Sequence, residues 1–202
     1  MIEIKNLCKK FGDKVIFNNF NVTIEDGEFV VFAGRSGCGK TTLLNIIGAL
    51  EKPDSGSIVV NGLDINNKKN QKEYFRNVVG FLFQNFALVE NKSVKENLEL
   101  VQKKQRTDMS LQEALKTVGL EEKEEEMVYK LSGGEQQRVA LARLMIKKCN
   151  IILADEPTGS LDTQNAQMVL ETLKKMNKQG KTVILVTHDE RIIASSERVI
   201  KL

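Results

Sequence analysis

One stretch of the sequence decides the fold: Gly34-Arg35-Ser36-Gly37-Cys38-Gly39-Lys40-Thr41. It fits the phosphate-binding pattern G-x-x-x-x-G-K-[ST] at every fixed position. The glycines let consecutive backbone N–H groups form a nest for an anion, and the following helix adds the positive end of its dipole. We expect Lys40 to reach the β- and γ-phosphates and the Thr41 hydroxyl to ligate Mg²⁺. Alone, this loop (the P-loop) predicts only that a nucleoside triphosphate binds.

The segments on either side of the P-loop support this interpretation. Phe29 to Phe32 is an apolar run of strand length, and Thr41 to Leu50 opens a helix. A true P-loop lies between a strand and a helix in this order. This context argues against the alternative, a glycine-rich turn with a chance lysine.

A second stretch narrows the class: Leu131-Ser132-Gly133-Gly134-Glu135-Gln136-Gln137-Arg138. It resembles the signature motif of the ATP-binding-cassette (ABC) ATPases. In that family, Ser and Gly backbone groups at a helix N-terminus grip the γ-phosphate of a nucleotide held by a second subunit. The resemblance assigns this contact to Ser132, Gly133, Gly134 and Glu135. Because the two half-sites of one chain cannot face each other, it also implies a homodimer or a pseudo-symmetric dimer.

Two carboxylates end the apolar strand Ile151 to Ala154. A carboxylate at the carboxyl end of a strand beside the P-loop is placed to hold Mg²⁺ through water, which fits Asp155. Glu156 points to the other side of the strand end, where it can orient or deprotonate the attacking water. The alternative is an ordinary acidic turn before Pro157.

Two polar residues follow other apolar strands. His188 is the only histidine of the chain, and Thr187-His188-Asp189 resembles the switch histidine of the family, which contacts the γ-phosphate. Gln84 follows Gly80 to Phe83 and resembles the glutamine that touches Mg²⁺ or the attacking water. A lone histidine at a strand end is more often structural, but the other motifs in the right order favour a catalytic role.

The resemblance supplies the remaining contacts. Gly159-Ser160-Leu161-Asp162 resembles the D-loop, which crosses the dimer interface, and Phe11 falls where the family stacks an aromatic ring on adenine; a core Phe is the alternative. The cofactors implied are ATP and Mg²⁺. The nucleotide contacts expected within one chain are Phe11, Gly34, Arg35, Ser36, Gly37, Cys38, Gly39, Lys40, Thr41 and Thr42.

The fold class that the resemblance implies is α/β: a P-loop NTPase core of the ABC type, with an antiparallel β-subdomain and an inserted helical subdomain. We expect one domain over residues 1–202, with the core and β-subdomain in 1–84 and 150–202 and the helical subdomain in about 85–149. Thr182 to Val186 is expected to be the last core strand.

Hydrophobic periodicity predicts helix from Ser93 to about Gly119. Just before it, Phe86, Leu88 and Val89 fall in an expected loop. Exposed apolar side chains in a loop favour a contact site for a membrane subunit. The alternative is that these side chains pack onto the core of the chain itself.

Composition bounds the class of protein. A length of 202 residues suits one α/β domain. A net charge of +3 from 30 basic and 27 acidic residues argues against a nucleic-acid partner. No apolar run reaches the ~20 residues that span a bilayer. Cys8, Cys38 and Cys149 lack metal-ligand spacing and indicate reduced cytosolic thiols.

The sequence therefore predicts an ATPase subunit that powers a separate membrane-spanning permease. Residues 80–88 and 153–162 look like the macrolide-efflux, lipoprotein-release and antimicrobial-peptide or bacteriocin-export branch, which implies export of a peptide, drug or lipid-like substrate. The chain is expected to be cytoplasmic, held to the inner face of the membrane by its permease. One alternative is transmembrane signalling or cell-envelope regulation without transport. Another is a soluble ABC protein of DNA repair or ribosome function, but the coiled coils, zinc modules or tandem cassettes of those families are absent from the sequence.

Overall fold

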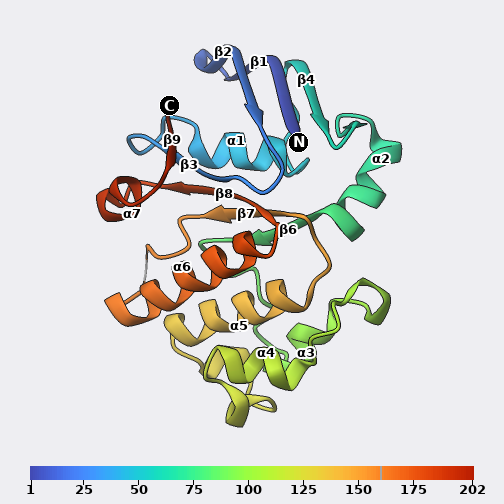
Figure 1. Ribbon diagram of the computed structural model, residues 1–202, viewed down its shortest axis with the longest axis vertical. Coiled ribbons are helices and arrows are strands. Elements are labelled where there is room, and N and C mark those ends of the chain that lie inside the picture. Colours follow the sequence, from blue (N-terminus) through green and yellow to red (C-terminus); the bar gives the residue numbers. More distant parts are fainter. Residues whose placement is uncertain (160) are drawn as a thin grey trace.

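The computed structural model describes residues 1–159 and 161–202, so Ser160 of the expected D-loop lies outside the described residues. Two sheets form the frame, one of five strands in the order β6-β7-β8-β3-β9 and one of four strands in the order β2-β1-β4-β5. Figure 1 shows them as separate layers with helix α1 (Lys40–Ile47) between them. Helices α5 (Gly133–Ile146) and α6 (Thr163–Lys178) cover the other face of the larger sheet.

The larger sheet is parallel in all its pairings. Every residue of its strands β7 and β8 is buried, as expected for a parallel sheet covered on both faces. Alternate residues divide between two cores: Val30 and Phe32 pack with helix α1, whereas Val31 packs with helices α5 and α6. The strands are β3 (Phe29–Ala33), β6 (Val79–Leu82), β7 (Ile151–Asp155), β8 (Thr182–Thr187) and β9 (Arg198–Lys201).

The smaller sheet is antiparallel and covers the opposite side of helix α1. Its apolar residues, such as Ile4 and Ile58, belong to the same core as Leu43 and Leu44 of helix α1. This packing brings strand β2 beside the P-loop that precedes helix α1. The strands are β1 (Ile2–Phe11), β2 (Lys14–Ile24), β4 (Ser55–Val60) and β5 (Leu63–Asp64).

The helical part lies at the end of the molecule farthest from the antiparallel sheet (Figure 1), where α3 and α4 pack against α5. The further α-helices are α2 (Lys68–Glu73), α3 (Val94–Glu99), α4 (Leu111–Thr117) and α7 (Glu190–Ala194). The segment Tyr74–Val78 is a π-helix, and short 3₁₀ helices span Lys103–Gln105, Glu121–Lys123 and Val128–Lys130.

The helical pattern from Ser93 to about Gly119 corresponds to two separate short α-helices, because Ser93 and Ser110 each form a capping box that starts one of them. One sequence expectation about the strands is wrong. Strand β8 is not the last core strand, since β9 adds a further parallel strand beside β3. A strand of this length carries too little alternation to be recognised in sequence.

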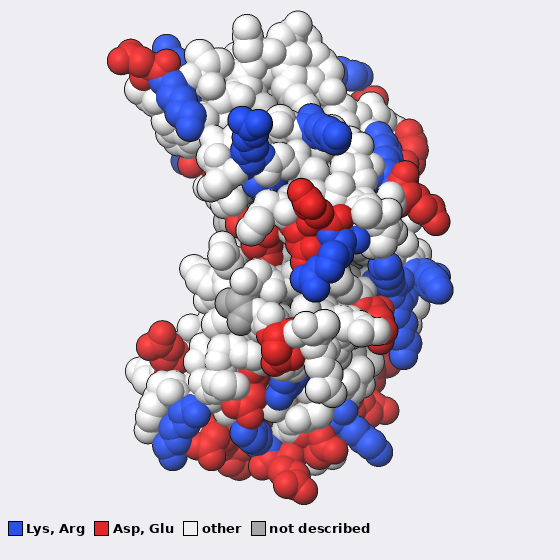
Figure 2. Space-filling model, turned by 90° about the vertical axis from the view of Figure 1, so that its left-hand side faces the viewer, with Lys and Arg blue, Asp and Glu red and all other residues white. Residues whose placement is uncertain are grey.

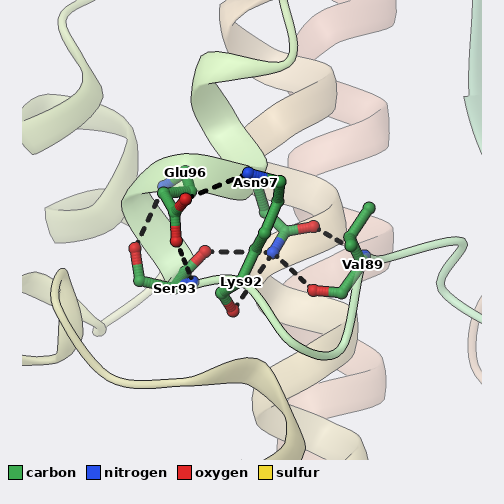
Figure 3. Close-up of polar contacts among 5 residues, drawn as sticks. All are labelled: Val89, Lys92, Ser93, Glu96 and Asn97. Carbon is green, nitrogen blue, oxygen red and sulfur yellow. Dashed lines mark hydrogen bonds and ion pairs between the residues drawn. The ribbon is translucent and has the colours of Figure 1, made fainter.

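The segment between β6 and α3 is held by side chains from two helices. Asn97 of α3 is fully buried, and its side chain accepts the Val89 N–H at 2.8 Å and donates to the Val89 carbonyl at 3.0 Å (Figure 3). Arg143 of α5 donates to the carbonyls of Phe86 and Ala87 at 3.0 and 2.7 Å. The loop is therefore tied to the helical core, although it contains no regular structure.

Phe86 and Leu88 are half-buried against the helical core, whereas Val89 is exposed. For Phe86 and Leu88 the structure agrees with the alternative interpretation, in which the side chains pack onto the chain itself.

Candidate functional site

A cavity of about 620 Å³ opens at the carboxyl edge of the parallel sheet. The P-loop, the ends of strands β6, β7 and β8, and the start of strand β2 surround it. Its lining residues are Phe11, Lys14, Ile16, Ser36, Gly37, Gly39, Lys40, Thr41, Thr42, Gln84, Glu156 and His188. The tertiary structure thus brings together expected site residues that are spread along the sequence from Phe11 to His188.

The backbone of the P-loop adopts conformations that glycine favours. Gly37 and Gly39 have φ angles of 76° and 107°. A Cβ atom on Gly39 would lie 2.4 Å from Cγ2 of Ile16 and 3.0 Å from the ring of Phe17. Strand β2 therefore packs so closely on the loop that no side chain fits at position 39.

Lys40 begins helix α1 and is buried, with an exposed fraction of 7%. Its Nζ donates to the carbonyl oxygens of Gly34 at 2.8 Å and Arg35 at 3.2 Å. These contacts fold the lysine back over the loop, beside the backbone nest. Its positive charge is therefore already in the cavity that would receive an anion.

Asp155 ends strand β7 and is also buried. Its Oδ1 accepts a hydrogen bond from the Thr41 hydroxyl at 3.0 Å. Burial raises the pKa of Asp155, and the Thr41 hydrogen bond opposes this rise. The two side chains thus place hard oxygen donors side by side, the kind of ligand that Mg²⁺ prefers.

The donor set fits Mg²⁺ because that ion is commonly held by one or two protein oxygens together with substrate phosphates. Within residues 1–159 and 161–202, no cluster of three or more His, Cys, Asp or Glu side chains could hold a metal ion.

Glu156 occupies a strained turn directly after Asp155, with a φ angle of 42°. Its backbone N–H donates to the carbonyl of Val186 at 3.0 Å. Its carboxylate accepts the Thr187 hydroxyl at 3.0 Å and lies 2.7 Å from Nδ1 of His188. The side chain of Glu156 is 11% exposed and that of His188 71% exposed, so the pair forms one wall of the cavity with the histidine toward solvent.

Two cavity residues escaped the sequence analysis. Lys14 lines the cavity and donates from Nζ to the carbonyl of Gly37 at 3.1 Å, and Ile16 lies against Gly39. Alternation along residues 14–16 was the only sequence signal for Lys14 and Ile16.

Phe11 lines the same cavity. It is 49% exposed, and Lys9 Nζ lies 4.8 Å from the centroid of its ring. The exposure of Phe11 argues against the alternative of a core Phe.

Three P-loop residues face elsewhere. Gly34, Arg35 and Cys38 line a neighbouring cavity that also includes His188 and Leu202. Cys8, Cys38 and Cys149 are free thiols.

Among the described residues that line the P-loop cavity, none belongs to the signature motif. Ser132 caps helix α5 in a capping box with Glu135. Its hydroxyl donates to Glu135 Oε2 at 2.9 Å, and Lys123 forms an ion pair with Glu135 Oε1. These bonds, that of Lys123 above all, lower the pKa of Glu135 to about 2.

Asp162 caps helix α6, where its side chain accepts the Asn165 N–H at 2.9 Å. Asn165 in turn contacts Arg138 of helix α5. A Cβ atom on Gly134 would lie 3.3 Å from the Asn165 amide, so the starts of the two helices are packed together. The signature motif and Asp162 thus share one surface, apart from the P-loop cavity.

On the face in Figure 2, basic and acidic side chains are interspersed over the described residues, without a continuous area of one sign. The helices of the described residues are all too short or too polar to cross a lipid bilayer.

A glycine-rich anion nest, a buried lysine, and two carboxylates at the end of another strand of the same parallel sheet define a P-loop ATPase domain. The chain belongs to the ABC transporter family, which matches residues 17–159. The expected fold class, an ABC ATPase core with a parallel and an antiparallel sheet and additional helices, is confirmed.

Relatives agree with this assignment. The macrolide export ATP-binding/permease protein MacB of Campylobacter jejuni is 43% identical over 100% of this chain, which spans about a third (33%) of that protein. MJ0796, an ABC transporter ATP-binding protein of Methanocaldococcus jannaschii, is 41% identical over 100% of this chain and 93% of its own length.

Two solved structures share the fold. The dimeric structure of the cassette MJ0796 superimposes with a TM-score of 0.90 at 40% identity, covering 100% of this chain and 94% of that chain. A dimeric post-hydrolysis state of the same cassette, bound to ADP and phosphate, gives a TM-score of 0.87 at 37% identity with the same coverage.

The close packing at Gly39 yields a first prediction. Gly39→Ala should lower the affinity for ATP at least about tenfold, because the methyl group displaces Ile16 and Phe17 and the left-handed backbone is strained. Gly62→Ala is the matched control, since Gly62 also has a positive φ, of 78°, but open space around the added atom. We expect Gly62→Ala to bind ATP as the parent does. Titration with a fluorescent ATP analogue measures both, and equal affinities for the two variants would contradict the packing argument.

Proposed function

We propose that this chain is the ATP-hydrolysing subunit of an ABC exporter. In this proposal it works as a dimer and drives a membrane-spanning permease. The observation that carries the proposal is the separation of the two motifs. Glu156 and His188 line the P-loop cavity, while the signature lies on another surface of the same chain. A site that needs both motifs must draw them from two subunits.

Lys40, Thr41 and Asp155 hold the phosphates and the metal in this proposal. Lys40 pairs with the β- and γ-phosphates, and Thr41 and Asp155 hold Mg²⁺. Mg²⁺ bound there supplies positive charge that stabilises the charge developing on the transferred phosphoryl group. The buried hydrogen bond between Thr41 and Asp155 supports this assignment, because it holds both oxygens in place beforehand.

Glu156 orients or deprotonates the attacking water, and His188 contacts the γ-phosphate. The 2.7 Å contact between the two side chains supports a joint role, since the histidine orients the carboxylate at the mouth of the cavity. Gln84 lines the same cavity and contacts Mg²⁺ or the water. Phe11 stacks on the adenine, for which its exposed ring is suited.

The partner subunit completes the site. Ser132, with the backbone at Gly133, Gly134 and Glu135, grips the γ-phosphate of the nucleotide on the other subunit from the start of helix α5. Asp162, at the start of helix α6, lies in the dimer interface. The dimeric structures of the similar cassette MJ0796 support this arrangement.

The permease contacts the helical subdomain, about residues 85–149, of the single domain formed by residues 1–202. Export of a peptide, drug or lipid-like substrate is supported by the identity to MacB over the whole chain. The name of MacB combines ATP-binding and permease functions in one protein, whereas that of MJ0796 gives ATP binding alone. We propose the second arrangement, with a separate permease that holds this chain at the cytoplasmic face of the membrane.

Catalysis by Glu156 is tested by Glu156→Gln. The variant should keep its affinity for ATP, because the size of the side chain is unchanged. Turnover should fall by at least the ~10²-fold typical of a lost general base. Phosphate release under excess ATP measures the effect. Hydrolysis at close to the parent rate would exclude Glu156 as the base.

The composite site is tested by trapping the dimer. Glu156→Gln with ATP should form a dimer in size-exclusion chromatography, and adding Ser132→Arg should abolish it, because the large side chain fills the space of the partner's phosphate. Ser110→Arg is the matched control, since Ser110 is an exposed capping-box serine of helix α4. A tight ATP-dependent dimer that survives Ser132→Arg would contradict the sandwich arrangement.

The permease is tested by affinity purification from membranes of the source cell, with a tag on this chain. We expect a multi-spanning membrane protein to co-purify in stoichiometric amount and to raise the ATPase rate in lipid vesicles. Recovery of a cytosolic or nucleic-acid-bound complex in its place would exclude the exporter.

A further inference from the structure

The helical part of the chain uses one capping device at three helix starts. Ser93, Ser110 and Ser132 each accept the backbone N–H of a glutamate three positions later, and that glutamate accepts the backbone N–H of the serine. Such a reciprocal pair satisfies backbone donors that have no partner within the helix. Capping alone therefore explains a serine and a glutamate at each place.

The start of helix α5 carries a further contact. Lys123, in the 3₁₀ helix Glu121–Lys123, forms an ion pair with Oε1 of Glu135 across twelve positions of sequence. The other oxygen, Oε2, accepts both the backbone N–H of Ser132 at 2.8 Å and its hydroxyl at 2.9 Å. The side chain of Glu135 is 19% exposed and that of Lys123 is 43% exposed, so the pair lies at the surface, beside the serine.

This arrangement matters for the composite site of the proposed function, on which the following inference rests. A serine hydroxyl has one proton to donate. In the single subunit the Ser132 hydroxyl donates it to Glu135, and the same proton must turn to the phosphate of the partner's nucleotide. After the proton has turned, the Glu135 carboxylate still lies beside the Ser132 hydroxyl, and therefore close to the highly charged phosphate that this hydroxyl binds. Like charges at such a separation repel strongly at a partly desolvated interface.

We propose that Lys123 is a positioning residue of the composite nucleotide site. It neutralises Glu135 and holds Oε1, so that Glu135 keeps capping the helix through the Ser132 N–H while the Ser132 hydroxyl is released to the phosphate. Lys123 does not itself contact the nucleotide. It removes the repulsion that the capping glutamate would otherwise exert.

Helix α3 provides the matched control within the same subdomain. Lys92 pairs with Oε1 of Glu96 at 3.0 Å, and Glu96 caps with Ser93 (Figure 3). Ser93, however, is buried, with an exposed fraction of 6%, and cannot meet an external anion. Lys92→Met therefore removes a lysine that pairs with a capping glutamate, as Lys123 does. It can weaken the start of helix α3, but it cannot affect a bound phosphate.

The experiment measures the ATP concentration that gives half-maximal dimer in the Glu156→Gln background, at about 50 mM salt, where charges are weakly screened. Lys123→Met should raise this concentration at least about tenfold, equivalent to about 1.4 kcal/mol. Lys123→Arg should restore the parent value, and Lys92→Met should equal it. Because the effect is electrostatic, the deficit of Lys123→Met should shrink as salt is raised to about 1 M.

A double substitution separates charge from structure. Glu135→Gln keeps an acceptor for the Ser132 N–H but carries no charge. If Lys123 acts by neutralising Glu135, adding Lys123→Met to Glu135→Gln should change nothing. The inference is overturned if Lys123→Met dimerises like the parent, if Lys92→Met shows the same deficit, or if the deficit persists with Glu135→Gln. Failure of the Glu156→Gln parent to dimerise with ATP would instead refute the composite site, and the role of Lys123 with it.

Discussion

The register of three parallel strands is the constraint on which the rest of the site depends. Ala33 of strand β3 pairs with Thr187 of β8, and Asp155 of β7 pairs with Val186 of β8. The P-loop, the carboxylates of Asp155 and Glu156, and His188 therefore start from the same edge at nearly the same level. Since alternate side chains of these strands fill two different cores, a slip of one residue would exchange the cores. Packing on both faces of the sheet thus fixes the geometry at its edge.

The turn after strand β7 uses this fixed edge to hold a strained residue. Glu156 has a left-handed backbone without being glycine, which costs on the order of 1–2 kcal/mol. Bonds to the Val186 carbonyl and the Thr187 hydroxyl, both from the neighbouring strand, offset that cost. This backbone conformation directs the Glu156 carboxylate toward His188, whereas the Asp155 carboxylate accepts the hydrogen bond from Thr41. Two adjacent carboxylates thereby acquire different surroundings, as the different roles proposed for them require.

Helix α5 connects the signature to segments that flank strands β6 and β7. The Gln137 amide donates to the Pro157 carbonyl, just after Glu156, at 2.9 Å. Arg143 holds the loop after Gln84, and Lys147 at the end of the helix donates to the carbonyl of Val79 at 2.7 Å. The helix that begins at the signature is thus hydrogen-bonded along its length to segments that follow or flank strands β6 and β7, close to Gln84 and Glu156.

The sequence by itself determined the class of protein and the continuous motifs, because the anion nest of the P-loop is formed by consecutive residues and can be read from their order alone. Strand β9 was missed since its few residues are ordered by pairing with β3, which no local pattern encodes. Lys14 and Lys123 escaped for the same reason: each acts on a loop or helix start from another part of the chain. Only the tertiary structure decided which separate segments meet, because packing of two cores, and not local propensity, sets those contacts.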